Sequence, residues 1–227
     1  MRERCPPWIR FTLGLTLMLI PAMALAGGDV ALLIGQKDLD LDLNPSDPFD
    51  ALLGPLEDQS EFGVMFNFSG DGWPVSLAVD VLLADDDVTG SYSYYYPGYG
   101  TVTADVKFDV QTIEINVGVR KQFGEGKFRG YVGGGGDFIT LDADASATLT
   151  AVGFPTITDS ESDSDSGFGY WLNGGFIAQV GQKVNVGLDA RLTGADLEIF
   201  PEPGFDDSFD AGGFHIGAFV GFRWGGG

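Results

Sequence analysis

The chain has 227 residues, about the length of one all-β barrel or sandwich domain. Its 33 Asp and Glu outnumber its 12 Lys and Arg, and the formal net charge of -21 excludes non-specific nucleic-acid binding, which needs a basic surface. One cysteine and one histidine exclude a disulfide framework and are too few for a Cys/His metal site.

The first 26 residues have the three parts of a secretory signal peptide. A basic start with three arginines precedes an apolar stretch at 11–20, and Ala24-Leu25-Ala26 is an A-x-A cleavage site. We expect residues 1–26 to be removed on export and residues 27–227 to form one domain. No later apolar run reaches the ~18 residues that a transmembrane helix needs, so a helical membrane protein is excluded.

Apolar residues then alternate with polar or small ones, the pattern of strands with one apolar face. The final strand is an example, because Phe214, Ile216, Ala218 and Val220 are separated by residues of mixed character. The same reasoning predicts eight strands, at about 29–37, 62–68, 75–83, 106–119, 128–141, 167–179, 184–192 and 214–224.

The connections between these strands alternate in length. Gly-rich tight turns are predicted at 69–72, 124–127 and 181–183. Long loops are predicted at 38–60, 85–104, 142–166 and 195–210. Short turns at one end and long loops at the other are typical of an outer-membrane barrel with an even number of strands.

The alternation of apolar and polar residues does not by itself decide whether the apolar face points outward to lipid or inward, as in a soluble lipocalin-type barrel. Three features favour lipid. The mixed face carries opposite charges among glycines, aromatic residues gather near strand ends, and a lipocalin has no reason for the asymmetry between turns and loops.

The export signal, the eight alternating segments and the final strand ending Phe222-Arg223-Trp224 resemble the small outer-membrane β-barrel proteins of the OmpA-like and OmpW-like porin superfamily. The resemblance implies an eight-stranded antiparallel up-and-down transmembrane barrel in a Gram-negative outer membrane. It also implies periplasmic turns, outward loops, and a terminal aromatic residue read by the barrel assembly machinery. Gly225, Gly226 and Gly227 follow that residue, which departs from the family pattern.

Charged residues on the mixed face are expected to form one or two ionic clusters that plug the lumen, because a charge in a narrow barrel is costly unless it is paired. Glu114 and Arg120 are an example of such a pair. The predicted lumen cluster comprises Glu61, Asp80, Glu114, Arg120, Asp189, Arg191 and Arg223.

The strand at 106–119 changes phase, since Val106, Phe108 and Val110 are even-numbered and Ile113 and Ile115 are odd-numbered. If both sets face lipid, a β-bulge near Gln111-Thr112 must absorb one residue. The alternative is that the strand leaves the bilayer by Val110 and the upper set packs among the loops.

The four long loops hold 22 acidic residues and no Lys or Arg. A solvated acidic surface explains this, and so does capture of Mg²⁺ or Ca²⁺ beside lipopolysaccharide phosphates. The candidate cation-binding loop has acids at alternate positions (Asp159, Glu161, Asp163 and Asp165) but lacks the glycine and the twelfth ligand of an EF-hand.

Catalytic signals are few. His215 is the sole histidine, has no hydroxyl residue within two positions, and is best interpreted as an interior histidine bonded to a carboxylate. The sequence therefore favours a barrel with no enzymatic activity and no cofactor, acting as a structural or surface-interaction protein. Tyrosines at 92–99 form either an adhesive patch or an aromatic belt. The alternative function is a narrow channel or transporter for small cations or hydrophobic molecules.

Overall fold

The computed structural model describes residues 27–39, 58–70, 72–97, 100–198 and 208–225. The predicted signal peptide lies outside these residues, as do most of the first predicted loop and the middle of the fourth. Among the described residues, no helix is long and apolar enough to cross a membrane.

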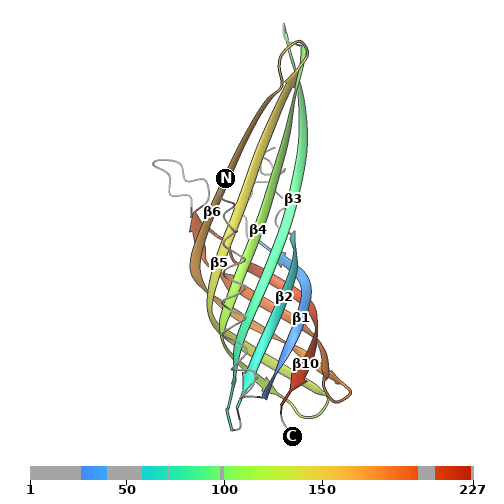
Figure 1. Cartoon of the computed structure of the whole chain (residues 1–227), viewed down its shortest axis with the longest axis vertical. Helices are drawn as coiled ribbons and strands as arrows, with labels where there is room; N and C mark the ends of the chain where they lie inside the picture. Colours follow the sequence, from blue (N-terminus) through green and yellow to red (C-terminus); the bar gives the residue numbers. More distant parts are fainter. Residues whose placement is uncertain (1–26, 40–57, 71, 98–99, 199–207, 226–227) are drawn as a thin grey trace, which may run out of the picture.

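The described chain forms a closed antiparallel barrel of eight strands, so the predicted fold class is confirmed (Figure 1). Around the barrel the order is β1-β10-β7-β6-β5-β4-β3-β2, and neighbours in the chain lie side by side. The barrel strands are β1 (Gly27–Asp38), β2 (Asp58–Ser69), β3 (Ser76–Tyr96), β4 (Gly100–Phe123), β5 (Phe128–Ala151), β6 (Ile157–Val180), β7 (Val184–Gly194) and β10 (Gly213–Trp224). Two short strands, β8 (Asp196–Glu198) and β9 (Ser208–Asp210), pair within the fourth predicted loop.

The tight turns have the expected chemistry. In the β4–β5 turn, Gly124 and Gly126 have φ angles of 96° and 81°, which L side chains rarely adopt. Because β2–β3, β4–β5 and β6–β7 are all joined at the same end, the other four connections lie at the opposite end.

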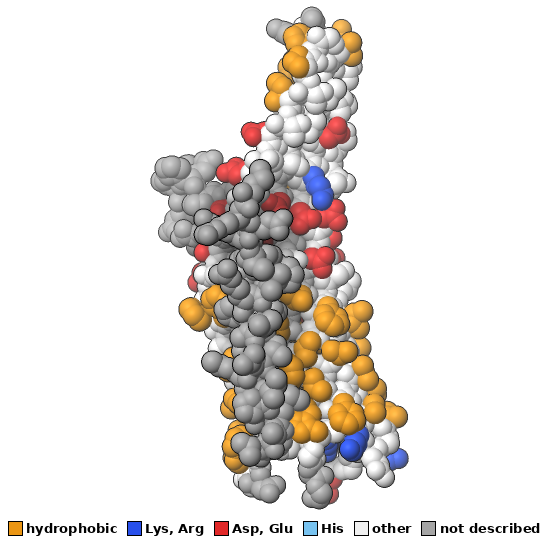
Figure 2. All heavy atoms as spheres, in the orientation of Figure 1, with side chains coloured by type: hydrophobic (Ala, Val, Ile, Leu, Met, Phe, Trp, Pro, Cys, Tyr) orange, Lys and Arg blue, Asp and Glu red, His pale blue; other side chains and the backbone are white. Residues whose placement is uncertain are grey.

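The apolar face points outward. Ile34, Phe176 and Leu188 are 70%, 73% and 59% exposed, whereas charged and amide side chains of the alternate positions are buried. Figure 2 shows the apolar side chains as a band around the lower part of the molecule, with basic residues below and acidic residues above. A closed barrel with this band has the build of an outer-membrane protein, not of a soluble lipocalin-type barrel.

Strands β3 to β6 are much longer than predicted. Residues 85–96, 100–104, 142–151 and 157–166, expected to lie in loops, continue the strands in antiparallel register. A four-stranded sheet therefore projects beyond the barrel. From Asp86 to Tyr96 the projection is about 35 Å long at the usual rise of a strand.

The predicted β-bulge is wrong. Residues 109–114 of β4 pair with both neighbouring strands without interruption, and Val110 packs against the buried cluster at the outer end of the lumen. The change of phase instead marks the point where the strand leaves the apolar band. Below it the apolar residues face lipid, and above it they face inward while Asp105, Lys107 and Asp109 face water.

Candidate functional site

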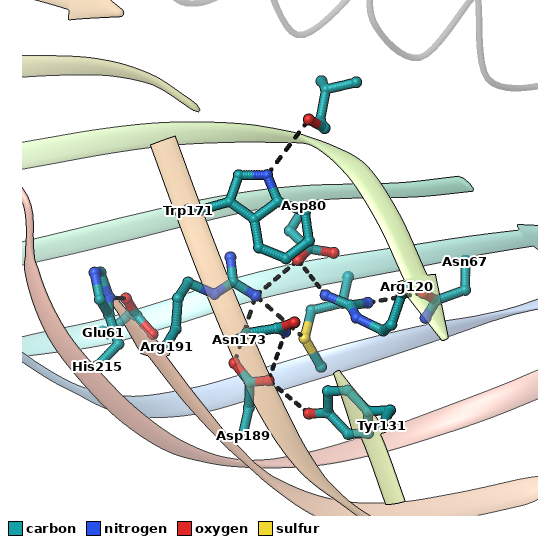
Figure 3. Close-up of polar contacts among 12 residues, drawn as sticks. Glu61, Asn67, Asp80, Arg120, Tyr131, Trp171, Asn173, Asp189, Arg191 and His215 are labelled. Carbon is teal, nitrogen blue, oxygen red and sulfur yellow. Dashed lines mark hydrogen bonds and ion pairs between the residues drawn. The ribbon is translucent and has the colours of Figure 1, made fainter. Parts of the chain in front are cut away.

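The interior of the barrel is a network of ion pairs contributed by several strands. At its centre, Asp80 on β3 accepts hydrogen bonds from Arg120 on β4 and from Arg191 on β7, each at 2.7 Å through the same carboxylate oxygen (Figure 3). Arg191 also lies 3.5 Å from Asp189. All four side chains are buried. One carboxylate therefore joins two strands that are not neighbours in the barrel wall.

Aromatic and amide side chains surround this centre. The Tyr131 hydroxyl donates to Asp189 at 2.5 Å, and Arg120 donates to the Asn67 side chain at 2.8 Å. The Trp171 ring centre lies 5.6 Å from the Arg120 guanidinium and 5.4 Å from that of Arg191. These contacts hold both guanidinium groups in place by cation–π attraction as well as by charge.

Trp171 corrects one sequence interpretation. Tyr170 and Trp171 are among the aromatic residues near strand ends that the sequence predicts at the membrane interface. Trp171, however, is fully buried, and its indole N–H points to the Val117 carbonyl. Tyr170, its neighbour in the chain, faces outward and is 54% exposed. Strand alternation places one residue of the pair inside and the other outside.

A second ionic group contains the histidine. His215 is bonded through Nδ1 to Glu61, and its Nε2 lies 3.0 Å from the Thr193 hydroxyl and 3.7 Å from Glu114. Lys37 donates to Glu114 at 2.5 Å and to the Ala211 carbonyl at 2.8 Å. The interpretation of His215 as an interior histidine bonded to a carboxylate is confirmed. Since His215 is only 2% exposed, it is closed to any substrate from solution.

The lumen leaves little free volume. Towards the turn end, a cavity of about 10 Å³ is lined by Asp29, Asn67 and Arg120 among others, enough for about one water molecule. Towards the outer end, Ile139, Leu141 and Leu197 belong to a buried apolar cluster.

The structure places six of the seven predicted lumen residues inside the barrel, each within an ion pair. Arg223 is the exception: it is half-buried opposite Asp29 at the turn end and makes no ion pair within 4 Å in the described part of the chain. The suggested pairing of Glu114 with Arg120 is also wrong, because Glu114 pairs with Lys37 and Arg120 with Asp80.

Sequence reasoning omitted Lys37 from the cluster. The alternation of side chains could have identified it. Ala31, Leu33 and Lys37 are odd-numbered residues on the same face of β1, and all three are buried. Lys37 is the last residue of the predicted first strand, and β1 ends one residue later, at Asp38.

The candidate cation-binding loop is not a loop. Asp159, Glu161, Asp163 and Asp165 lie in β6, on the face that continues the barrel interior, and successive acids are about 6.7 Å apart along an extended strand. No three acidic or histidine side chains in the described ranges converge as ligands of one metal ion. In this extended conformation, the four acids of the segment cannot by themselves surround one cation.

An acidic belt lies just above the apolar band on the outer face of the projecting sheet. It consists of Asp85, Asp87, Asp109, Asp142 and Asp144. Asp87 lies directly opposite Asp109, and Asp109 directly opposite Asp144. Lys107 lies 3.5 Å from Asp109 and 4.0 Å from Asp87. Like charges directly opposite across strands are destabilising, so this row attracts counter-ions.

The far end of the projecting sheet, here called the tip, consists of residues 92–97, 100–104 and 149–157, which lie beyond the last charged residues of the sheet. It contains no charged residue, although the chain as a whole is strongly acidic. Tyr94, Tyr95, Val152 and Ile157 are 68%, 66%, 82% and 61% exposed, and the Tyr94 and Tyr96 rings lie 5.0 Å apart. Figure 2 shows apolar side chains gathered at this end, separated from the membrane band by the acidic belt.

No family model matches the chain, and no curated protein matches it by sequence. Solved structures of small outer-membrane barrels are similar to it in fold. OprG from Pseudomonas aeruginosa matches with a TM-score of 0.47 at 11% identity, over 88% of this chain and 98% of OprG. Neisserial surface protein A matches with 0.44 at 10% identity (87% and 96%), and Ail from Yersinia pestis with 0.40 at 10% identity (88% and 99%). The chain is thus similar to small outer-membrane β-barrels.

Proposed function

We propose that this protein is an exported, non-enzymatic barrel of the Gram-negative outer membrane that binds other molecules at the cell surface through its tip. Export would use the signal peptide at 1–26, and the barrel assembly machinery would insert residues 27–227 by reading the final strand. The single observation that carries the surface role is the uncharged, tyrosine-rich tip, held away from the membrane on a rigid sheet.

The composition of the tip suits protein recognition. Tyrosine supplies a large contact area at low conformational cost, and serine and glycine supply adaptable polar contacts, the combination found in antibody binding loops. The stretch from Ser91 to Gly100 contains five tyrosines, two serines and two glycines. Large exposed apolar patches on a polar support commonly mark interaction sites.

The distribution of charge supports the same proposal. Bacterial and host surfaces are mostly anionic, and a net charge of -21 would repel them. At the usual rise of a strand, Tyr92 to Tyr96 lie about 17 to 30 Å beyond Asp87 of the belt, at least twice the ~8 Å screening length at physiological ionic strength. The tip can therefore contact an anionic partner without repulsion from the belt.

The tip is tested by replacing Tyr94, Tyr95 and Tyr96 with serine in cells that display the barrel. Loss of central aromatic contacts costs more than about 1.4 kcal/mol, so attachment to protein-coated surfaces is expected to fall about tenfold or more. A matched control replaces Ser160, Ser162 and Ser164, on the outer face of β6, with alanine. Equal attachment by both variants and the wild type, at equal surface expression, would exclude the tip as the contact site.

We further propose that the acidic belt contacts lipopolysaccharide through divalent cations. The belt lies directly above the apolar band, the level at which lipid phosphates lie. Asp109 and Asp144 also line a groove of about 330 Å³ with Lys107. Because this row supplies only pairs of neighbouring carboxylates, Mg²⁺ or Ca²⁺ would complete its oxygen shell with phosphate oxygens and water.

If the belt binds lipopolysaccharide through divalent cations, the barrel should be stabilised only when lipopolysaccharide and the cation are both present. Lipopolysaccharide with Mg²⁺ should raise the unfolding temperature of the purified barrel, and EDTA should remove the increase. Asp109→Asn combined with Asp144→Asn should abolish it, while Asp196→Asn in β8, outside the belt, should not. An increase that survives both EDTA and the double replacement would rule out cation bridging at the belt.

The alternative of a narrow channel or transporter finds less support. We propose that the ion-pair network plugs the lumen, since its charged side chains are almost completely buried and the apolar cluster lies above them. An eight-stranded barrel is just wide enough for its interior to be filled by side chains.

A further inference from the structure

One buried acid in the lumen has no counter-charge. Among the described residues, five carboxylates and four basic groups are buried inside the barrel, even if His215 is counted as charged. Four of the acids lie in ion pairs with these basic groups. The remaining acid is Asp137 on β5. Both the excess of one acid and the list of ion pairs therefore identify Asp137 as the acid without a basic partner.

Asp137 is only 2% exposed, and neither of its carboxylate oxygens has a hydrogen-bond partner. Lys37 and Arg191 attract it, but both are paired with other acids, and Glu114 repels it. A buried carboxylate without a partner is among the costliest groups in a protein. Something positive must compensate it.

The neighbours of Asp137 supply more unpaired oxygens. Asn116 lies directly opposite Asp137 on β4, and Asp80 lies directly opposite Asn116 on β3. Glu114 is two residues before Asn116 on the same face of its strand. One oxygen each of Asp80, Glu114 and Asn116 has no hydrogen-bond partner, which makes five unpaired oxygens together with the two of Asp137.

Five buried donor nitrogens of the described chain are also unpaired. Beside these oxygens stands the Asn116 amide nitrogen, which is also unpaired. The other four belong to Gln59, Arg120, Arg129 and Arg191, whose side chains are held by partners other than Asp137. Carboxylate and amide oxygens on directly opposite residues, as in Asp137 and Asn116, are the ligand chemistry of a hard cation.

We infer that a small monovalent cation of the sodium class is bound inside the barrel by Asp137, Asn116 and Glu114, as the counter-charge of Asp137. One positive charge supplies the counter-charge that Asp137 lacks. The site lies below the apolar cluster of Ile139 and Leu141, so the ion is enclosed when the barrel folds and exchanges slowly. The inference is independent of the proposed surface function.

The test folds the barrel from denaturant into detergent with NaCl, KCl or choline chloride at equal ionic strength, because a buried site fills during folding. Wild-type protein is expected to unfold about tenfold more slowly in sodium than in choline, the effect of a ligand at about ten times its dissociation constant. Asp137→Asn should be insensitive to the salt. Asp196→Asn, which removes an exposed acid outside both the lumen and the belt, should retain the full difference.

Two results would overturn the cation. Equal wild-type unfolding rates in all three salts would show that Asp137 is neutralised by a proton. A sodium effect that persists in Asp137→Asn would place the ion elsewhere. If that variant does not fold, anomalous scattering from wild-type crystals grown with Tl⁺ decides the question, with a peak expected between Asp137 and Asn116 and its absence contradicting the site.

Discussion

Replacement of Asp80 by alanine is expected to lower the free energy of unfolding by about 3–5 kcal/mol, the usual cost of leaving a buried ionic partner uncompensated. Asp80 is fully buried and accepts hydrogen bonds from both Arg120 and Arg191. Without it, two guanidinium groups share the lumen, and Arg191 retains only the longer contact with Asp189. Equilibrium unfolding of the purified barrel in detergent measures the loss.

Two variants make the Asp80 experiment specific. Asp80→Asn keeps the shape and one acceptor oxygen while removing the charge, so its loss should be smaller. Asp142→Ala removes an exposed acid of the belt and should change the free energy of unfolding by less than about 0.5 kcal/mol. If Asp80→Ala instead keeps its stability and conducts ions in planar bilayers, water has replaced the carboxylate, and the network is a removable gate rather than a plug.

Replacement of Lys37 by methionine is expected to be similarly costly, about 3–5 kcal/mol. Lys37 is fully buried and neutralises Glu114, which already lies close to the uncompensated Asp137. The variant would leave two neighbouring acids with less positive charge around them. Methionine preserves most of the volume and the apolar stem, so the measured loss reports the charge.

The double variant Lys37→Met with Glu114→Gln should recover a large part of this loss, because it removes both charges of the pair. A coupling energy above about 1 kcal/mol in the double-mutant cycle is expected for residues in direct contact. Additive losses would mean that Glu114 depends on His215 rather than on Lys37. Glu61→Gln, which removes the other partner of His215, distinguishes that case.

Alternation was enough to predict the barrel wall. All eight predicted strands exist, and the tight turns fall where glycine was found, because period two and turn chemistry are local properties. Strand length was misjudged for a physical reason. Above the apolar band the outward face of β6 carries Ser160, Ser162 and Ser164, and a polar acidic sequence was interpreted as loop. Because that face of the strand is exposed to water, polar residues there are compatible with a strand.

The sequence by itself determined the class of fold, the outward apolar face and the set of acids and bases that point inward, because each follows from the alternation of side chains along one strand. Only the tertiary structure decided which charges meet. Asp80 and Arg191 are 111 positions apart, and Lys37 and Glu114 are 77 positions apart. Both contacts depend on barrel closure and strand register. Closure also left Asp137 without an ion pair among the described residues, and the extension of β3 to β6 placed the tip beyond the acidic belt. Patterns along a single strand cannot predict these features, because they arise from packing between strands.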